Sequence, residues 1–125
     1  MRLRFFEIAT EQAESSTQGN FRMGALLVRG KNIIRRATNH RVKSHPLKAM
    51  MYPTRGSGLH AEVALLRGFR PYDVAGSDVY VVRVLADGAR ALAKPCDPCA
   101  NYMRDLGISR VFYSVNDSEF QFFKL

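Results

Sequence analysis

Leu59-His60-Ala61-Glu62-Val63 and Pro95-Cys96-Asp97-Pro98-Cys99 are the two stretches around which this chain is organised. The first stretch offers an imidazole and, two residues later, a carboxylate, and the second offers two thiols. One histidine and two cysteines are three ligands that suit zinc, and a tetrahedral ion then keeps its fourth position for water. Glu62 is left over, which is typical of a catalytic rather than a structural metal site. The sequence therefore predicts a zinc centre held by His60, Cys96 and Cys99.

The two cysteines allow other interpretations. A C-x-x-C pair can form a disulfide in a secreted domain or a thioredoxin-like redox pair in an intracellular one. Either interpretation leaves His60 and Glu62 without a role. A structural zinc site with four protein ligands would need His40 or His45 as well, and both lie in a polar, basic segment that is predicted to be a loop.

Length and composition predict one globular domain over residues 1–125. The chain is 46% apolar, so it can bury a core, and no apolar run approaches the roughly 20 residues that cross a membrane. No signal-type segment follows the basic start, so we expect an intracellular, cytoplasmic protein. The net charge of +8 serves solubility or indicates an anionic partner, which would be a nucleotide phosphate or a nucleic acid strand.

The hydrophobic pattern predicts an α/β fold. Phe5, Phe6, Ala9 and Ala13 repeat at helical spacing, and Gly107 suits the end of a later helix. We expect helices over residues 3–16, 60–69 and 96–106, and strands over residues 23–28, 33–39, 79–85, 111–114 and 120–122. The alternation of strands and helices after the first hairpin implies a mixed sheet with helices on its faces. About three residues join the last two strands, so these two should be antiparallel.

Both groups of candidate ligands fall where a predicted helix begins. A strand–helix unit separates them in sequence, and that length makes the two helix starts neighbours in space. The long segment before His60 is predicted to be a loop, and loops of this length are often functional. Its basic residues could bind a phosphate or form a solvated face; they are Arg41, Lys43, His45, Lys48 and Arg55.

The pattern H-x-E followed by P-C-x-x-C is the signature of zinc-dependent nucleobase deaminases. Four other segments also carry the likeness to this class of enzymes: Met23-Gly24-Ala25-Leu26-Leu27-Val28, Thr38-Asn39, Lys94-Pro95-Cys96 and residues 107–114. From about Phe21 to Ser114 the chain therefore resembles the cytidine and deoxycytidylate deaminase superfamily, in particular its small members of phage and bacterial type.

This resemblance implies a three-layer fold with a five-stranded mixed sheet, a Zn²⁺ cofactor and a homo-oligomer. It implies that Glu62 moves protons between water, the base and the leaving ammonia. It implies that Asn39 contacts the sugar or backbone of the substrate and that the Ala61 N–H binds the carbonyl of the base. Judged alone, Glu62 could instead stabilise a helix start, and Asn39 could instead form a turn after its strand.

The form of the substrate stays open at this point. H-A-E resembles the deoxycytidylate and tRNA-adenosine branches, whereas the short hairpin ending resembles free-nucleoside deaminases. Leu92-Ala93-Lys94 differs from the Ser-Trp-Ser sequence of polynucleotide cytosine deaminases, and the chain has no Trp. We expect hydrolytic deamination of cytosine in a free (deoxy)cytidine nucleoside or nucleotide. The alternatives are a deaminase of cytosine or adenine in single-stranded DNA or tRNA and a non-catalytic, zinc-stabilised nucleic acid-binding module.

Overall fold

A computed structural model describes residues 2–16, 19–39 and 60–125 of the chain. Its sheet begins with a hairpin of β1 (Arg22–Arg29) and β2 (Asn32–Thr38). Arg29 pairs with Asn32, so only two residues form the turn, and Gly30 supplies its left-handed backbone with φ of 62°. The hairpin predicted from the sequence is confirmed.

The remaining strands complete a mixed sheet. In sequence order they are β3 (Asp78–Val84), β4 (Arg90–Ala91), β5 (Arg110–Ser114) and β6 (Phe120–Lys124). The strand order is β2-β1-β3-β5-β6, with β3 and β5 parallel and every other pair antiparallel. The predicted five-stranded mixed sheet and its antiparallel last pair are confirmed. The two-residue β4, which pairs with the end of β3, is an addition that the sequence did not predict.

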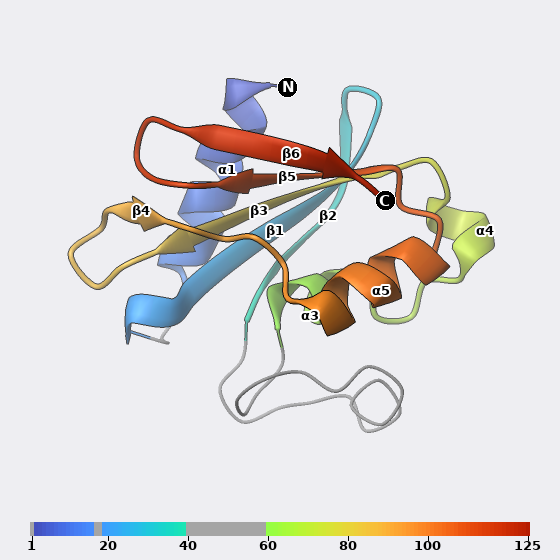
Figure 1. The fold of residues 1–125 in the computed structure, drawn as a ribbon, viewed down its shortest axis with the longest axis horizontal. Coiled ribbons are helices and arrows are strands. Elements are labelled where there is room, and N and C mark those ends of the chain that lie inside the picture. Colours follow the sequence, from blue (N-terminus) through green and yellow to red (C-terminus); the bar gives the residue numbers. More distant parts are fainter. Residues whose placement is uncertain (1, 17–18, 40–59) are drawn as a thin grey trace.

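Helices cover both faces of the sheet (Figure 1). One face carries α1 (Leu3–Glu14), and the other carries α3 (Ala61–Leu66), α4 (Pro71–Val74) and α5 (Asp97–Asp105). The 3₁₀ turn η1 (Gly19–Phe21) leads from α1 into β1. The helices lie where the sequence predicted them, although α3 ends three residues earlier than expected and α4 was not predicted.

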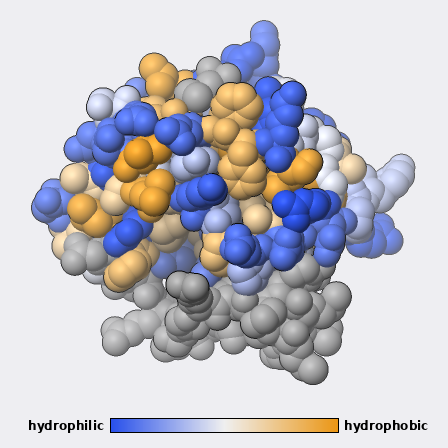
Figure 2. Space-filling view, in the orientation of Figure 1, coloured by the Kyte–Doolittle hydropathy of each residue, from blue (hydrophilic) through white to orange (hydrophobic). Residues whose placement is uncertain are grey.

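The core is split by the sheet into two layers. On one face, α1 buries the four residues that its spacing predicted, Phe5, Phe6, Ala9 and Ala13, against β1, β3 and β5. The other layer packs α3 and α5 against the same strands. Figure 2 shows that apolar side chains on the face toward the viewer are interspersed with hydrophilic ones. Among the described residues, no helix is long and apolar enough to cross a membrane.

Two glycines fix how the helices meet the sheet. A Cβ atom at Gly24 would lie 2.3 Å from the Ala9 carbonyl oxygen and 2.5 Å from the Ala13 nitrogen, so α1 rests directly on the β1 backbone. Gly107 follows α5 with φ of 82°. Its N–H and that of Ile108 donate to carbonyls of the last turn, 3.0 Å each, which is a Schellman motif. Gly107 therefore ends the helix, as the sequence predicted.

Candidate metal centre

Two helix starts of nearly equal backbone geometry carry the predicted ligands. His60 is the N-cap of α3 with φ, ψ of −65°, 149°, and Cys96 is the N-cap of α5 with −67°, 162°. Neither side chain turns back to cap its own helix. Cys99 lies one turn into α5, at a spacing that places it on the same side of the helix as Cys96. Because α3 packs against α5, the three side chains converge.

The three ligand atoms are close enough for one metal ion. The His60 Nδ1 atom lies 3.8 Å from the Cys96 Sγ atom and 3.4 Å from the Cys99 Sγ atom. All three atoms lie within 4.8 Å of one another, and the described residues contain one such group. Zinc–nitrogen and zinc–sulfur bonds of about 2.0 and 2.3 Å at tetrahedral angles separate nitrogen from sulfur by about 3.5 Å. Spacing and donor chemistry therefore both fit zinc.

The two thiols of this group have different proton affinities. A hydrogen bond from Cys99 is the main cause that lowers the pKa of Cys96 to about 4. The same hydrogen bond, followed by burial, raises the pKa of Cys99. Cys96 is half-buried and Cys99 is fully buried. The first proton therefore leaves from the half-buried thiol, which gives the anionic sulfur that a metal binds.

Glu62 lies in the first turn of α3, beside the cluster. Its side chain is only 3% exposed, and it interacts with the side chain of Cys99. Burial raises the pKa of the Glu62 carboxyl above its ordinary value of 4.5, although its backbone hydrogen bond and the neighbouring His60 oppose the shift. A carboxyl whose pKa is raised by burial keeps its proton at a higher pH than an exposed carboxyl does, which suits a group that carries protons.

The two residues predicted to contact substrate lie in different surroundings. Ala61 is the first residue of α3, so its N–H has no acceptor within the helix. The Asn39 side chain, at the end of β2, binds the neighbouring backbone. Its Oδ1 atom accepts hydrogen bonds from the Met23 N–H at 3.0 Å and the Ser16 hydroxyl at 2.8 Å, and its Nδ2 atom donates to the Phe21 carbonyl at 2.6 Å. One Nδ2 hydrogen is left over from these bonds.

The segment that leads to Cys96 is fastened to the end of the sheet. The buried Ser114 hydroxyl donates to the Ala91 carbonyl at 2.7 Å and accepts from the Arg83 N–H at 3.3 Å, while the Ser114 carbonyl accepts from the Ala93 N–H at 2.8 Å. These bonds fix the chain three residues before the first thiol. Sequence reasoning did not single out Ser114.

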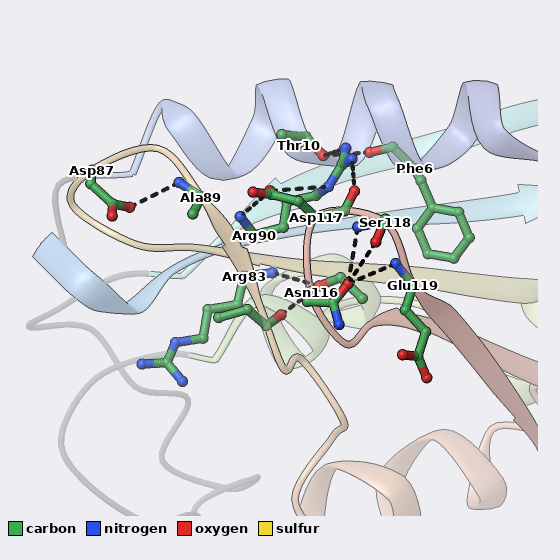
Figure 3. A network of polar contacts seen from close by, with 12 residues as sticks. Phe6, Thr10, Arg83, Asp87, Ala89, Arg90, Asn116, Asp117, Ser118 and Glu119 are labelled. Carbon is green, nitrogen blue, oxygen red and sulfur yellow. Dashed lines mark hydrogen bonds and ion pairs between the residues drawn. The ribbon is translucent and has the colours of Figure 1, made fainter.

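A second set of contacts holds β4 from the outside (Figure 3). The Arg90 backbone N–H donates to the Asp117 carboxylate at 2.7 Å, and its guanidinium donates to the Asp117 carbonyl at 2.5 Å and the Thr10 hydroxyl at 3.3 Å. Arg90 therefore links β4 to the β5–β6 turn and to α1. The basic residues between Asn39 and His60, which the sequence indicated as a possible phosphate site, lie outside the described residues.

Solved structures with the same fold include deaminases. A cytidine deaminase from Burkholderia pseudomallei superposes with a TM-score of 0.68 at 21% identity, over 99% of this chain and 92% of that chain. The apo dCMP deaminase from the cyanophage S-TIM5 gives 0.64 at 17% identity, over 90% and 81%. A structure from a study of A-to-I editing by tRNA:A34 deaminases gives 0.57 at 24% identity, over 91% and 72%. At these identities the likeness shows the fold alone.

The comparison at the level of sequence families is more specific. Among curated proteins, none matches the chain. The family model of the cytidine and deoxycytidylate deaminase zinc-binding region matches residues 1–115, which include α1 as well as the two ligand motifs. With a cluster that fits zinc at the matched motifs, the chain belongs to the zinc-binding family of cytidine and deoxycytidylate deaminases.

Proposed function

We propose that this protein hydrolytically deaminates cytosine to uracil in a free cytidine or deoxycytidine nucleoside or nucleotide, as a single domain over residues 1–125. The observation that carries the proposal is the cluster of His60, Cys96 and Cys99 with the buried carboxyl of Glu62 against Cys99. Three protein ligands leave room for water, and a neighbouring proton carrier completes a hydrolytic site.

The proposed roles follow from these residues. His60, Cys96 and Cys99 would hold the ion, and the chemistry that bound zinc supplies is Lewis-acid activation of water. Glu62 takes a proton from the attacking water and delivers it to the ring nitrogen of the base. It then assists the departure of the amino group as ammonia, so that one C–O bond forms and one C–N bond breaks. The Ala61 N–H would hold the base carbonyl.

Support for a free nucleoside or nucleotide comes from a solved structure with a similar fold. The cyanophage enzyme, whose fold is similar, has a structure in complex with dCMP and dUMP. A mononucleotide is therefore the substrate form that we favour.

A second candidate, a deaminase of single-stranded DNA or tRNA, is favoured by the net charge of +8. Nucleic acid binding that depends on phosphate contacts weakens steeply with salt. Strong, salt-sensitive binding of a cytosine-bearing oligonucleotide, together with its deamination, would favour this candidate.

The deciding experiment is an ultraviolet absorbance assay of zinc-loaded protein with deoxycytidine, deoxycytidine monophosphate and a cytosine-bearing oligonucleotide in parallel. We expect turnover of at least one of the two small substrates, with ammonia released in equal amount. Turnover of the oligonucleotide alone would overturn the proposal in favour of the second candidate. Absence of ammonia from every cytosine and adenine substrate would favour the non-catalytic zinc-stabilised module. The family resemblance also favours a homo-oligomer, which light scattering can test.

A further inference from the structure

The two edge strands of the sheet differ in features that prevent pairing with another strand. β2 carries the adjacent arginines Arg35 and Arg36, and its register against β1 shifts between Leu27 and Val28. Charges and bulges keep an edge strand from adding a further strand. β6 pairs with β5 in unbroken register, and Lys124 is its one charged residue. Within the described ranges, no strand lies on the outer side of β6.

The backbone of β6 directs hydrogen-bonding groups to its outer side. The Leu125 N–H donates to the Ser109 carbonyl at 3.1 Å, and the Glu119 carbonyl accepts from the Val115 N–H at 2.9 Å. Residues 119 and 125 therefore face β5, and the direction of the backbone groups alternates along an antiparallel strand. The residues whose backbone groups point away from β5 are consequently Phe120, Phe122 and Lys124. Another strand can pair with these groups.

A row of aromatic rings crosses the sheet on the α1 face and ends on this edge strand. Tyr80 is paired with Phe112 across β3 and β5, and Phe112 is paired with Phe122 across β5 and β6. The ring centroids of Tyr80 and Phe112 are 4.5 Å apart, and those of Phe112 and Phe122 are 5.4 Å apart. Tyr80 and Phe112 are buried in the layer of α1, whereas Phe122 is 49% exposed. The row therefore ends in a half-exposed ring.

A second copy of the chain is complementary to this edge. Two β6 strands related by a twofold axis perpendicular to the sheet run antiparallel and keep their α1 faces on the same side. With the axis at Phe122, all five residues of β6 pair, and Phe120 lies opposite the partner's Lys124. This register brings the two exposed rings together, so that the aromatic row continues into the second copy. It also keeps the two ammonium groups apart, which matters because each chain has a net charge of +8.

We propose that β6 is a dimerisation strand, through which two copies of this protein join edge to edge into one continuous sheet. The inference is independent of the proposed deaminase activity, because Phe122 lies on the α1 face and the metal centre lies on the other. The paired segment is about 17 Å long, which makes a small interface. The dimer should therefore be weak, and its population should rise with protein concentration.

Sedimentation equilibrium of the zinc-loaded protein from about 10 µM to about 1 mM measures this association. We expect the wild type to form dimers whose fraction increases over this range. Phe122→Asp removes two rings from the centre of the interface and places two like charges across the axis, so the dissociation constant should rise at least about 10-fold. Ile34→Asp is the matched control, since Ile34 is an apolar residue of the other edge strand and is 48% exposed. It should dimerise as the wild type does.

Amide hydrogen exchange on the wild type keeps the test decisive if Phe122→Asp does not fold. The N–H groups of Phe120, Phe122 and Lys124 should exchange more slowly as the dimer forms, whereas those of Gln121 and Phe123, which face β5, should change little. Three results would each overturn the inference. These are a wild type that stays monomeric over this range, equal dissociation constants for the two aspartate variants, and a dimer in which the three outward N–H groups gain no protection.

Discussion

Replacement of Glu62 by glutamine tests the proposed chemistry most directly. The substitution keeps the size and hydrogen-bonding capacity of the side chain but removes its ability to carry a proton. Proton transfer by a positioned carboxyl contributes about 10²- to 10⁴-fold to a rate, which corresponds to about 3–5 kcal/mol of transition-state stabilisation. We expect kcat to fall by this factor while the zinc content stays near one ion per chain.

The structure also predicts what this substitution does to stability. Glu62 is 3% exposed, and burial is the main cause of its raised pKa, so the folded protein holds a carboxyl in surroundings that disfavour its charge. Glutamine removes this cost, and the free energy of unfolding at neutral pH should stay equal or increase. Kinetics by ultraviolet absorbance, zinc by atomic absorption and stability by urea denaturation give the three measurements. A Glu62→Gln protein that retains zinc and near wild-type kcat would refute the assignment.

Three further substitutions test the metal ligands, the packing of α1 on Gly24 and the contacts by which Arg90 holds β4. Cys99→Ser should lose zinc and lower the melting temperature, because the ion links α3 to α5; a variant with stoichiometric, tightly held zinc would contradict this. Gly24→Ala should lower the free energy of unfolding by about 1–3 kcal/mol in urea denaturation, since the added methyl group meets α1 backbone, and an unchanged midpoint would argue against that contact. Arg90→Gln should lower the free energy of unfolding by about 1–2 kcal/mol in the same assay, a modest loss because the contacts to Asp117 are partly exposed. A change within error would show that these contacts contribute little.

The parts of the fold that the sequence could predict are those encoded locally. The four apolar residues of α1 follow helical spacing and are the residues that the helix buries. Gly107 ends α5 because its left-handed backbone suits glycine. The convergence of His60 with Cys96 and Cys99 was predictable because their residue types and spacings have few other uses, and the two cysteines lie on one helix turn.

The parts that the sequence could not predict depend on contacts between distant segments. β4 is a two-residue strand whose position depends on Ser114 and Asp117, and neither is near it in sequence. Asn39 was predicted as a substrate contact, and nothing local reveals that its amide binds the backbone around η1. Arg83 is a charge within an otherwise apolar central strand, and its contact with the Phe21 ring joins segments that are far apart in the sequence.

The hydrogen bonds of Ser114 make the path of the chain into Cys96 independent of the length of the β3–β4 turn. The bonds from Ser114 to Ala91 and Ala93 set the path into the first thiol, whereas residues 86–88 at the hairpin tip are exposed beyond them. Changes in tip length should therefore leave the metal ligands where they are, and exposed tips tolerate insertion well. New recognition elements could therefore be inserted at this tip without moving the metal ligands.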